Sequence, residues 1–324
     1  MRDNDKLLAV KYLTKVFTLG GGFSRSKLIA VNKACFEIES AKAEIFTLAG
    51  ESGSGKTTLA RMILGFIEST SGSIIYKGKD TTKIKSRKEK LRFMKEVQPI
   101  FQDPFDTFNP LKKVDIYLYE TAMNFGIAYH RKDPDQVVES ALDLVGLSLQ
   151  EIRGRYPHEL SGGQAQRTSV ARALITSPLL LVADEPVSMV DASLRMSIVN
   201  LFKKFKDERG INVIYITHDL ATAYYVSDRI AIMLRGDIIE SGSVKEVLVN
   251  PLHPYTKTLK ESVPNPDPDK RWKSNIELST FEVKEFSRTG CKFAGRCSYT
   301  MDVCKEKEPR DSFVEGRNVK CHLY

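Results

Sequence analysis

The spacing of hydrophobic residues predicts an opening of short strands followed by one amphipathic helix. Apolar runs at residues 7–13 and 34–39 are typical of strands, and the glycine-rich segment 20–22 separates them. Residues 44–49 have the composition of a buried strand that ends at a glycine. Apolar residues then recur within 59–66 at i, i+3, i+4 and i+7, the period of a helix with one buried face.

The second half of the chain alternates between the two periods. Segments 179–183 and 213–217 read as buried strands, and segments 194–205 and 220–226 read as helices that follow them. A hairpin is expected at 229–242, around an Arg-Gly-Asp turn. Strands that alternate with helices favour an α/β fold with a mainly parallel sheet.

The pattern changes twice, and these changes suggest domain limits. Residues 103–165 hold helical patterns interrupted by Pro and Gly, which indicates an inserted helical subdomain within a first domain at 1–250. Residues 251–324 form a separate C-terminal extension in this interpretation. Its proline-rich and charged segment 262–274 reads as a linker.

Composition narrows the class of protein. The 324 residues are 42% hydrophobic and 28% charged, the usual mix for a chain with a full core. No secretory signal and no apolar run of membrane-spanning length is expected. The net charge of +8 is densest at 76–95, which leaves a solubilising surface, an anionic ligand, a membrane surface and nucleic acid as open readings.

The segment GESGSGKT fits the phosphate-binding pattern G-x-x-x-x-G-K-[ST] and lies between a predicted strand and helix. Its glycines allow a tight turn whose N–H groups converge on one anion, and the next helix adds its positive N-terminal end. The lysine reaches the β- and γ-phosphates of ATP, and the threonine hydroxyl binds Mg²⁺. The predicted nucleotide-binding residues are Gly50, Glu51, Ser52, Gly53, Ser54, Gly55, Lys56, Thr57 and Thr58.

Two adjacent acids end the apolar strand LLLVA. An acid at the carboxyl edge of a parallel sheet is well placed to hold Mg²⁺, and this predicts Asp184 as a metal residue. Glu185 is the candidate general base, which polarises a water for attack on the γ-phosphate.

Together with LSGGQ, these pieces resemble the ATP-binding cassette (ABC) ATPases over about residues 7–250. The resemblance implies a P-loop NTPase core of ABC type: a mainly parallel sheet, an N-terminal antiparallel β subdomain and the inserted helical subdomain. It also implies that the LSGGQ helix contacts the γ-phosphate held by a partner cassette, so that hydrolysis needs a head-to-tail dimer. The LSGGQ residues assigned to nucleotide are Ser161, Gly162, Gly163 and Gln164.

Four further positions are carried over from the family motifs. Gln102 matches the Q-loop glutamine, which the family uses to sense Mg²⁺ and the attacking water, and His218 matches the switch histidine at the γ-phosphate. Asp191 matches the D-loop aspartate, although SMVD stands where SALD is usual. Phe17 lies where the family places the aromatic residue that stacks on adenine; a core role is the alternative.

The C-terminal extension resembles that of the oligopeptide/dipeptide importer ATPases. The carriers of this resemblance are NPLHPYTKTL and the later GCKFAGRCSYTMDVC, and YPHELSGGQAQR is more similar to the F-type than to the D-type cassette of such importers. The resemblance implies two permease subunits, a second ATPase (a heterodimer, with a homodimer possible in isolation) and, indirectly, an extracytoplasmic substrate-binding protein. It places the chain at the cytoplasmic face of the membrane. Peptides and oligosaccharides both remain open as cargo.

Four cysteines crowd the end of the chain: Cys291, Cys297, Cys304 and Cys321. They lack the paired C-x2-C chelates of most zinc sites, but four thiolates suit a soft metal centre. The family resemblance favours a [4Fe–4S] cluster, with zinc and unligated thiols as alternatives.

The sequence leaves two alternatives to ATP-driven import. An ABC ATPase of repair or translation would use the basic segment on nucleic acid, but such proteins usually carry two cassettes or a long coiled coil, and neither is present here. No nucleic-acid partner is therefore expected. An exporter cassette is the other alternative, and the importer-type tail argues against it.

Overall fold

The computed structural model describes residues 5–20, 26–128, 133–262, 285 and 288–324. The linker expected at 262–274 falls almost wholly outside these residues. Within the described ranges, no helix is both long and apolar enough to cross a bilayer.

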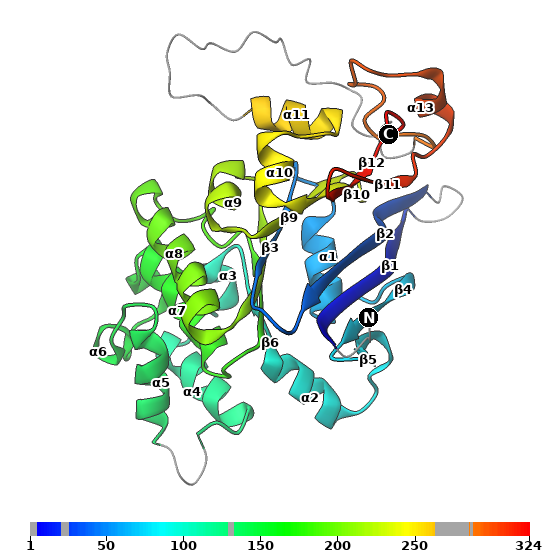
Figure 1. The fold of residues 1–324 in the computed structure, drawn as a ribbon. Helices are drawn as coiled ribbons and strands as arrows, with labels where there is room; N and C mark the ends of the chain where they lie inside the picture. Colours follow the sequence, from blue (N-terminus) through cyan, green and yellow to red (C-terminus); the bar gives the residue numbers. More distant parts are fainter. Residues whose placement is uncertain (1–4, 21–25, 129–132, 263–284, 286–287) are drawn as a thin grey trace.

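Two sheets organise the molecule (Figure 1). A four-stranded sheet has the order β2-β1-β4-β5, and an eight-stranded sheet has the order β11-β12-β10-β9-β3-β8-β7-β6. The strands are β1 (Lys6–Leu19), β2 (Ser26–Glu39), β3 (Ile45–Ala49), β4 (Ser71–Tyr76), β5 (Lys79–Asp80), β6 (Val97–Ile100), β7 (Leu180–Asp184), β8 (Asn212–Thr217), β9 (Arg229–Leu234), β10 (Asp237–Ser243), β11 (Asp311–Val314) and β12 (Arg317–Lys320).

The helices lie mostly between β6 and β7 and after β7. They are α1 (Lys56–Ile63), α2 (Arg87–Glu96), α3 (Pro104–Thr107), α4 (Val114–Asn124), α5 (Pro134–Asp143), α6 (Leu149–Ile152), α7 (Gly162–Leu174), α8 (Ala192–Arg209), α9 (Leu220–Val226), α10 (Val244–Val249), α11 (Pro254–Glu261) and α13 (Asp302–Glu306), with the 3₁₀ turns η2 (Thr81–Lys83) and η3 (Pro157–Glu159).

The centre of the large sheet is parallel, as its sequence predicts. Strands β9, β3, β8, β7 and β6 pair in parallel, and every residue of β3 and β8 is buried. Short apolar runs of this kind need cover on both faces. Helices α7, α8 and α9 cover one face, and α1 with the small sheet covers the other (Figure 1). The carboxyl ends of the parallel strands therefore meet at one edge.

The small sheet is antiparallel, and its two long strands differ from the short strands expected. Strand β1 pairs with β2 and β4 through several register shifts, and Tyr12 and Lys33 take positive φ angles of 49° and 45° at these irregularities. Such bulges let a strand run past an interrupted apolar pattern. Phe36 stacks on Phe46 at 4.7 Å between ring centroids, which joins the small sheet to the large one.

The helical segment expected at 103–165 contains α3 to α6, which pack around the buried residues Val114, Leu118, Val138 and Leu142. In Figure 1 these helices form a lobe at the lower left, beside α7 and α8. That residues 103–165 form a separate subdomain stays a prediction.

The C-terminal residues extend the large sheet. Strand β12 pairs antiparallel with β10, with Glu240 opposite Val319, and β11 pairs with β12. The tail therefore shares backbone hydrogen bonds with the core, which local sequence patterns did not predict.

Candidate nucleotide-binding site

The phosphate loop connects β3 to α1, and its backbone requires glycine. Gly50, Gly53 and Gly55 have φ angles of 148°, 77° and 105°. A Cβ on Gly50 would lie 2.2 Å from the Met233 carbonyl oxygen, and a Cβ on Gly55 would lie 2.2 Å from that of Ala30. Both contacts are with backbone, which cannot move aside as a flexible side chain can. The phosphate loop therefore packs so closely against the backbone of neighbouring segments that no side chain fits at Gly50 or Gly55.

Lys56 lies inside this loop and is only 5% exposed. Its Nζ donates to the carbonyl oxygens of Gly50 and Glu51, both at 2.8 Å, and to Ser54 Oγ at 3.3 Å. Burial lowers the pKa of Lys56, against the attraction of Glu185, Asp184 and Glu51. The loop therefore concentrates a cation where the sequence places the phosphates.

Thr57 and Asp184, the residues at the start of α1 and the end of β7 that are predicted to hold Mg²⁺, lie in contact. The Thr57 hydroxyl donates to Asp184 Oδ1 at 3.2 Å, between the start of α1 and the end of β7. Burial raises the pKa of Asp184, while the Thr57 hydrogen bond opposes that rise. Mg²⁺ in nucleotide sites typically takes one or two protein oxygens together with phosphate oxygens and waters, and this hard oxygen pair fits that demand.

Glu185 contacts the other two predicted catalytic residues, Gln102 and His218. Gln102 Nε2 donates to Glu185 Oε2 at 3.3 Å, and His218 Nδ1 lies 3.1 Å from Glu185 Oε1. Gln102 follows β6 and His218 follows β8, so three strand ends converge on one carboxylate. Glu185 itself has a φ of 45°, and its backbone N–H donates to the Ile216 carbonyl at 2.9 Å. This strained, fixed position aims the side chain.

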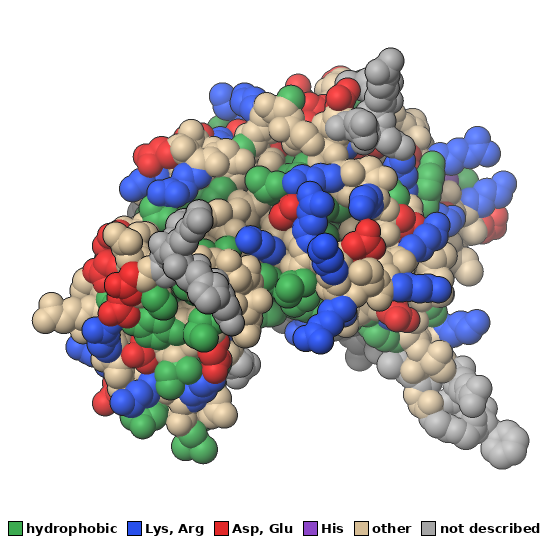
Figure 2. Space-filling view, turned by 90° about the horizontal axis from the view of Figure 1, so that it is seen from below, with side chains coloured by type: hydrophobic (Ala, Val, Ile, Leu, Met, Phe, Trp, Pro, Cys, Tyr) green, Lys and Arg blue, Asp and Glu red, His purple; other side chains and the backbone are tan. Residues whose placement is uncertain are grey.

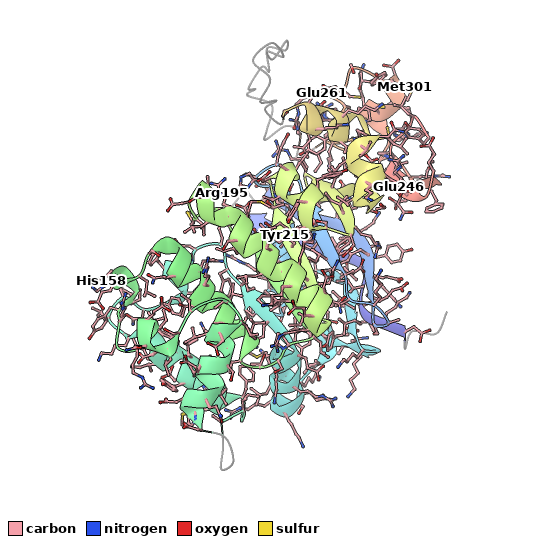
Figure 3. All side chains as sticks on the ribbon, turned by 60° about the vertical axis from the view of Figure 1, so that its left-hand side comes forward. His158, Arg195, Tyr215, Glu246, Glu261 and Met301 are labelled. Atoms are coloured by element: carbon pink, nitrogen blue, oxygen red, sulfur yellow. The ribbon has the colours of Figure 1, made fainter. Side chains whose placement is uncertain are left out.

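The LSGGQ segment begins α7 with a reciprocal cap. Gln164 N–H donates to Ser161 Oγ at 3.2 Å, and Ser161 N–H donates to Gln164 Oε1 at 3.1 Å. A Cβ on Gly162 would lie 3.4 Å from the Met189 carbonyl oxygen, so the segment lies beside the D-loop. Figure 3 shows His158, just before this segment, at the outer edge of the helical lobe.

For the remaining predicted residues, the structure shows their exposure and position in the fold. Asp191 is exposed at the N-terminal cap of α8. Ser52 is exposed at the turn of the phosphate loop, and Thr58 is half-buried in the first turn of α1. Phe17 is half-buried on β1, with Lys15 Nζ 5.1 Å from its ring centroid. Its stacking on adenine stays a prediction.

The four tail cysteines line a single small cavity. At Cys291, Cys297 and Cys321, the backbone N–H group two residues further on acts to lower the pKa of the thiol. Burial raises the pKa of all three, that of Cys291 to about 11. However, the described residues contain no group of three or more His, Cys, Asp or Glu side chains that could hold a metal ion.

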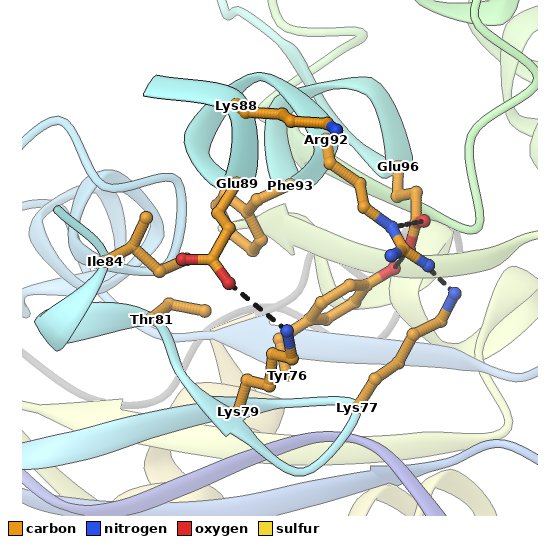
Figure 4. Close-up of a pocket in the computed structure, with 10 residues that line it drawn as sticks. All are labelled: Tyr76, Lys77, Lys79, Thr81, Ile84, Lys88, Glu89, Arg92, Phe93 and Glu96. Atoms are coloured by element: carbon orange, nitrogen blue, oxygen red, sulfur yellow. Dashed lines mark hydrogen bonds and ion pairs between the residues drawn. The ribbon is translucent and has the colours of Figure 1, made fainter. Parts of the chain in front are cut away.

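A separate cavity of about 300 Å³ lies under α2, in the basic segment (Figure 4). Its wall includes Tyr76 and Phe93, and several of its cations are paired: Lys77 with Glu96 at 2.7 Å, and Lys79 with Glu89 at 3.2 Å. Figure 2 shows Lys and Arg side chains gathered on the underside of the molecule, where α2 lies. None of the predicted site residues lines this cavity.

Sequence reasoning missed two residues that hold the phosphate loop from the C-terminal side. Glu51 N–H donates to Tyr255 Oη at 3.1 Å, and the Glu51 carboxylate pairs with Arg296 at 2.9 Å. Tyr255 stands in the HPYT sequence, and Arg296 immediately precedes a cysteine. The only sequence signal for this contact was Arg296, a charged residue between two of the cysteines in GCKFAGRC.

Comparison with known proteins shows the family of the chain and supports its fold. Residues 35–188 match the ABC transporter family, and residues 239–304 match the oligopeptide/dipeptide transporter C-terminal region. The dimeric post-hydrolysis ATP-binding cassette MJ0796, bound to ADP and Pi, superimposes with a TM-score of 0.64 at 24% identity, over 73% of this chain and 98% of that one. CbiO1 of Clostridium perfringens superimposes with a TM-score of 0.63 at 26% identity, over 76% and 92%.

The fold and the site thus define an ABC-type ATPase, and the predicted P-loop core is confirmed. Relatives narrow the class. Oligopeptide transport ATP-binding protein OppF of Streptococcus pyogenes serotype M1 is 41% identical over 82% of this chain and 84% of its own. The putative oligopeptide transport ATP-binding protein YkfD of Bacillus subtilis is 38% identical over 98% and 95%, and OppF of B. subtilis is 39% identical over 87% and 91%. The chain belongs to this family of oligopeptide transport ATP-binding proteins.

Proposed function

We propose that the chain hydrolyses ATP to energise an importer, with Glu185 as the catalytic base. The observation that carries this proposal is the convergence of Gln102 and His218 on the two oxygens of Glu185, one residue after the Thr57–Asp184 pair. A carboxylate that accepts from two sides is held at a fixed angle. It can then take a proton from a water aligned with the γ-phosphate.

The other residues divide the work of binding. Lys56 and the loop N–H groups hold the phosphates, while Thr57, Asp184 and Gln102 hold Mg²⁺. When bound, Mg²⁺ offsets the negative charge on the β- and γ-phosphates. In this proposal His218 contacts the γ-phosphate, and Phe17 stacks on adenine.

The active form in this proposal is a head-to-tail pair of cassettes. At the start of α7, Ser161 is exposed and Gly162 and Gln164 are half-buried, while Asp191 is exposed at the start of α8. A helix N-terminus of this kind attracts an anion, so it suits the γ-phosphate of ATP held by a partner cassette. The partner is a second, different ATPase of the same importer, with a homodimer possible in isolation.

The importer contains two permease subunits and is served indirectly by a substrate-binding protein. The chain acts from the cytoplasmic face of the membrane. Its relatives are named for oligopeptide transport, which favours peptides over oligosaccharides as cargo. Uptake of a labelled oligopeptide, and of a labelled oligosaccharide, by cells with and without the chain separates the two.

Dimer formation is tested with Ser161→Arg, which places a bulky cation at the cap of α7. We expect ATP to drive association of the purified chain with its partner cassette, and Ser161→Arg to abolish it while ATP binding by this chain persists. Ser140→Arg, on exposed α5, is the matched control. Equal association of all three proteins would contradict the shared site.

The tail cysteines are proposed to hold a [4Fe–4S] cluster, with zinc as the alternative. The backbone N–H groups near Cys291, Cys297 and Cys321 favour the thiolate form, although burial has the larger effect and raises the pKa of these thiols. Among the described residues no group of three or more His, Cys, Asp or Glu side chains could hold a metal ion, and this favours neither zinc nor the cluster. The support for the cluster is the family resemblance of the cysteine segment, together with the four cysteines that line one cavity. Anaerobic purification with iron, sulfide and zinc counts tests this; stoichiometric zinc without iron would overturn the cluster.

A further inference from the structure

Arg296 connects the cysteine segment to the phosphate loop. Its Nη1 donates to Glu51 Oε1 at 2.9 Å and its Nη2 to Glu51 Oε2 at 3.4 Å, a bidentate contact. Glu51 is the second residue of the phosphate loop, and its carbonyl oxygen accepts from Lys56. Glu51 thus connects Arg296, in the cysteine segment, with Lys56, the lysine that is assigned to the phosphates.

The guanidinium is fixed from its other side as well. Arg296 Nε donates to Glu285 Oε1 at 3.1 Å, and Glu285 is only 2% exposed and also pairs with Arg235 at 3.4 Å. The guanidinium lies 5.3 Å from the ring centroid of Phe293 and 5.9 Å from that of Tyr255. Charge-assisted pairs and aromatic faces of this kind hold an arginine in one orientation.

The backbone beneath Arg296 belongs to the loop that bears the cysteines. Arg296 N–H donates to the Phe293 carbonyl at 2.9 Å, and Cys291 N–H donates to the Cys304 carbonyl at 2.8 Å. Cys297 is the next residue. A change in how the cysteines are held therefore also shifts the backbone that carries Arg296.

We propose that Arg296 is a positioning residue: it clamps Glu51 and so makes the shape of the phosphate loop, and hence nucleotide affinity, depend on the folded cysteine segment. This rests on the proposed function of the loop in binding ATP. The ligand is the nucleotide already assigned to the site; the new element is its control by the C-terminal extension.

The test compares Arg296→Met with Arg296→Lys, which keeps the charge but loses the bidentate fork. Lys305→Met is the matched control, because Lys305 lies in the same extension and pairs with Asp302 on its own helix. We expect Arg296→Met to weaken binding of a fluorescent ATP analogue about threefold to tenfold, the range for a partly exposed charge-assisted pair. Arg296→Lys should restore part of the affinity, and Lys305→Met should match the wild type.

Hydrogen–deuterium exchange of the nucleotide-free protein gives a readout that does not depend on ATP. Arg296→Met, Arg296→Lys and Cys297→Ser should each raise exchange at residues 50–57, while Lys305→Met should not. Glu51→Gln should weaken affinity as Arg296→Met does, and the double variant should be no weaker than either single one.

The outcomes separate two failures. If the wild type binds ATP and Arg296→Met binds it equally with unchanged exchange, the clamp is wrong and the proposed function stands. If the wild type does not bind ATP, the proposed function falls. Additive effects of Arg296→Met and Glu51→Gln would also overturn the clamp, since they would show that the two side chains act separately.

Discussion

Replacing Glu185 by Gln removes one charge from the centre of the site and keeps its shape. Glu185 now accepts from Gln102 and faces His218 Nδ1. In the variant, the amide oxygen can still accept from Gln102, and the amide NH₂ can donate to His218 if Nδ1 is the unprotonated nitrogen. Both contacts survive a change of tautomer, and the repulsion between Glu185 and Asp184 disappears. We therefore expect folding and ATP binding to be retained.

Hydrolysis should fall sharply, because an amide cannot take the proton from water. General-base catalysis contributes about 10²–10⁴-fold, which is about 2.7–5.5 kcal/mol of activation free energy. Single-turnover phosphate release from Mg-ATP, measured with the partner cassette present, gives this ratio directly. Glu208→Gln, on the exposed face of α8, is the control for loss of one negative charge. Turnover of Glu185→Gln within threefold of the wild type would refute the assignment of the base.

Three further predictions concern stability. Burial raises the pKa of Asp184 above its ordinary value of 3.8, so the free energy of unfolding of the nucleotide-free protein should fall as pH rises through the window just above 3.8. Denaturant unfolding of Asp184→Asn should show a flatter dependence on pH. The same variant should lose Mg²⁺-dependent binding of ATP. Gly55→Ala combines a φ of 105° with a Cβ 2.2 Å from a backbone oxygen, so it should cost at least about 1–3 kcal/mol in urea unfolding, and an unchanged midpoint would contradict the loop geometry. Burial lowers the pKa of His253 from 6.5 to about 3. The free energy of unfolding should therefore fall by about 1.4 kcal/mol per pH unit as pH falls from 6.5 toward 3. His253→Asn keeps an acceptor for Tyr255 N–H and should remove this dependence on pH.

Much of the site could be predicted because its residues follow strand ends. The phosphate loop follows β3, Asp184 ends β7, and Gln102 and His218 follow β6 and β8. Buried strands with one acid or histidine just beyond them leave a strong local pattern. A parallel sheet then brings those ends to one edge without further information. The contact between Gln102 and Glu185 was not predicted, because the family resemblance assigned Gln102 only to Mg²⁺ and the attacking water.

Contacts between distant segments could not be predicted from local pattern. Arg296 and Glu51 are 245 positions apart, and neither the loop nor the tail shows which charge it meets. Strand β12 is four residues long and pairs with β10 through Glu240 and Ser241, too short a run for a period to be recognised. The bulges of β1 interrupt its apolar pattern, and for this reason the sequence predicted a short strand where the structure has one long strand.

The central claim is that the loop around Lys56 binds the phosphates of ATP. Calorimetric titration of Mg-ATP into the wild type and into Lys56→Ala tests it most directly, with thermal unfolding to show that both are folded. The account predicts saturable one-site binding by the wild type and a loss of about tenfold to a hundredfold in affinity for Lys56→Ala, the effect of losing charge-assisted hydrogen bonds. Equal affinities in two folded proteins would contradict it.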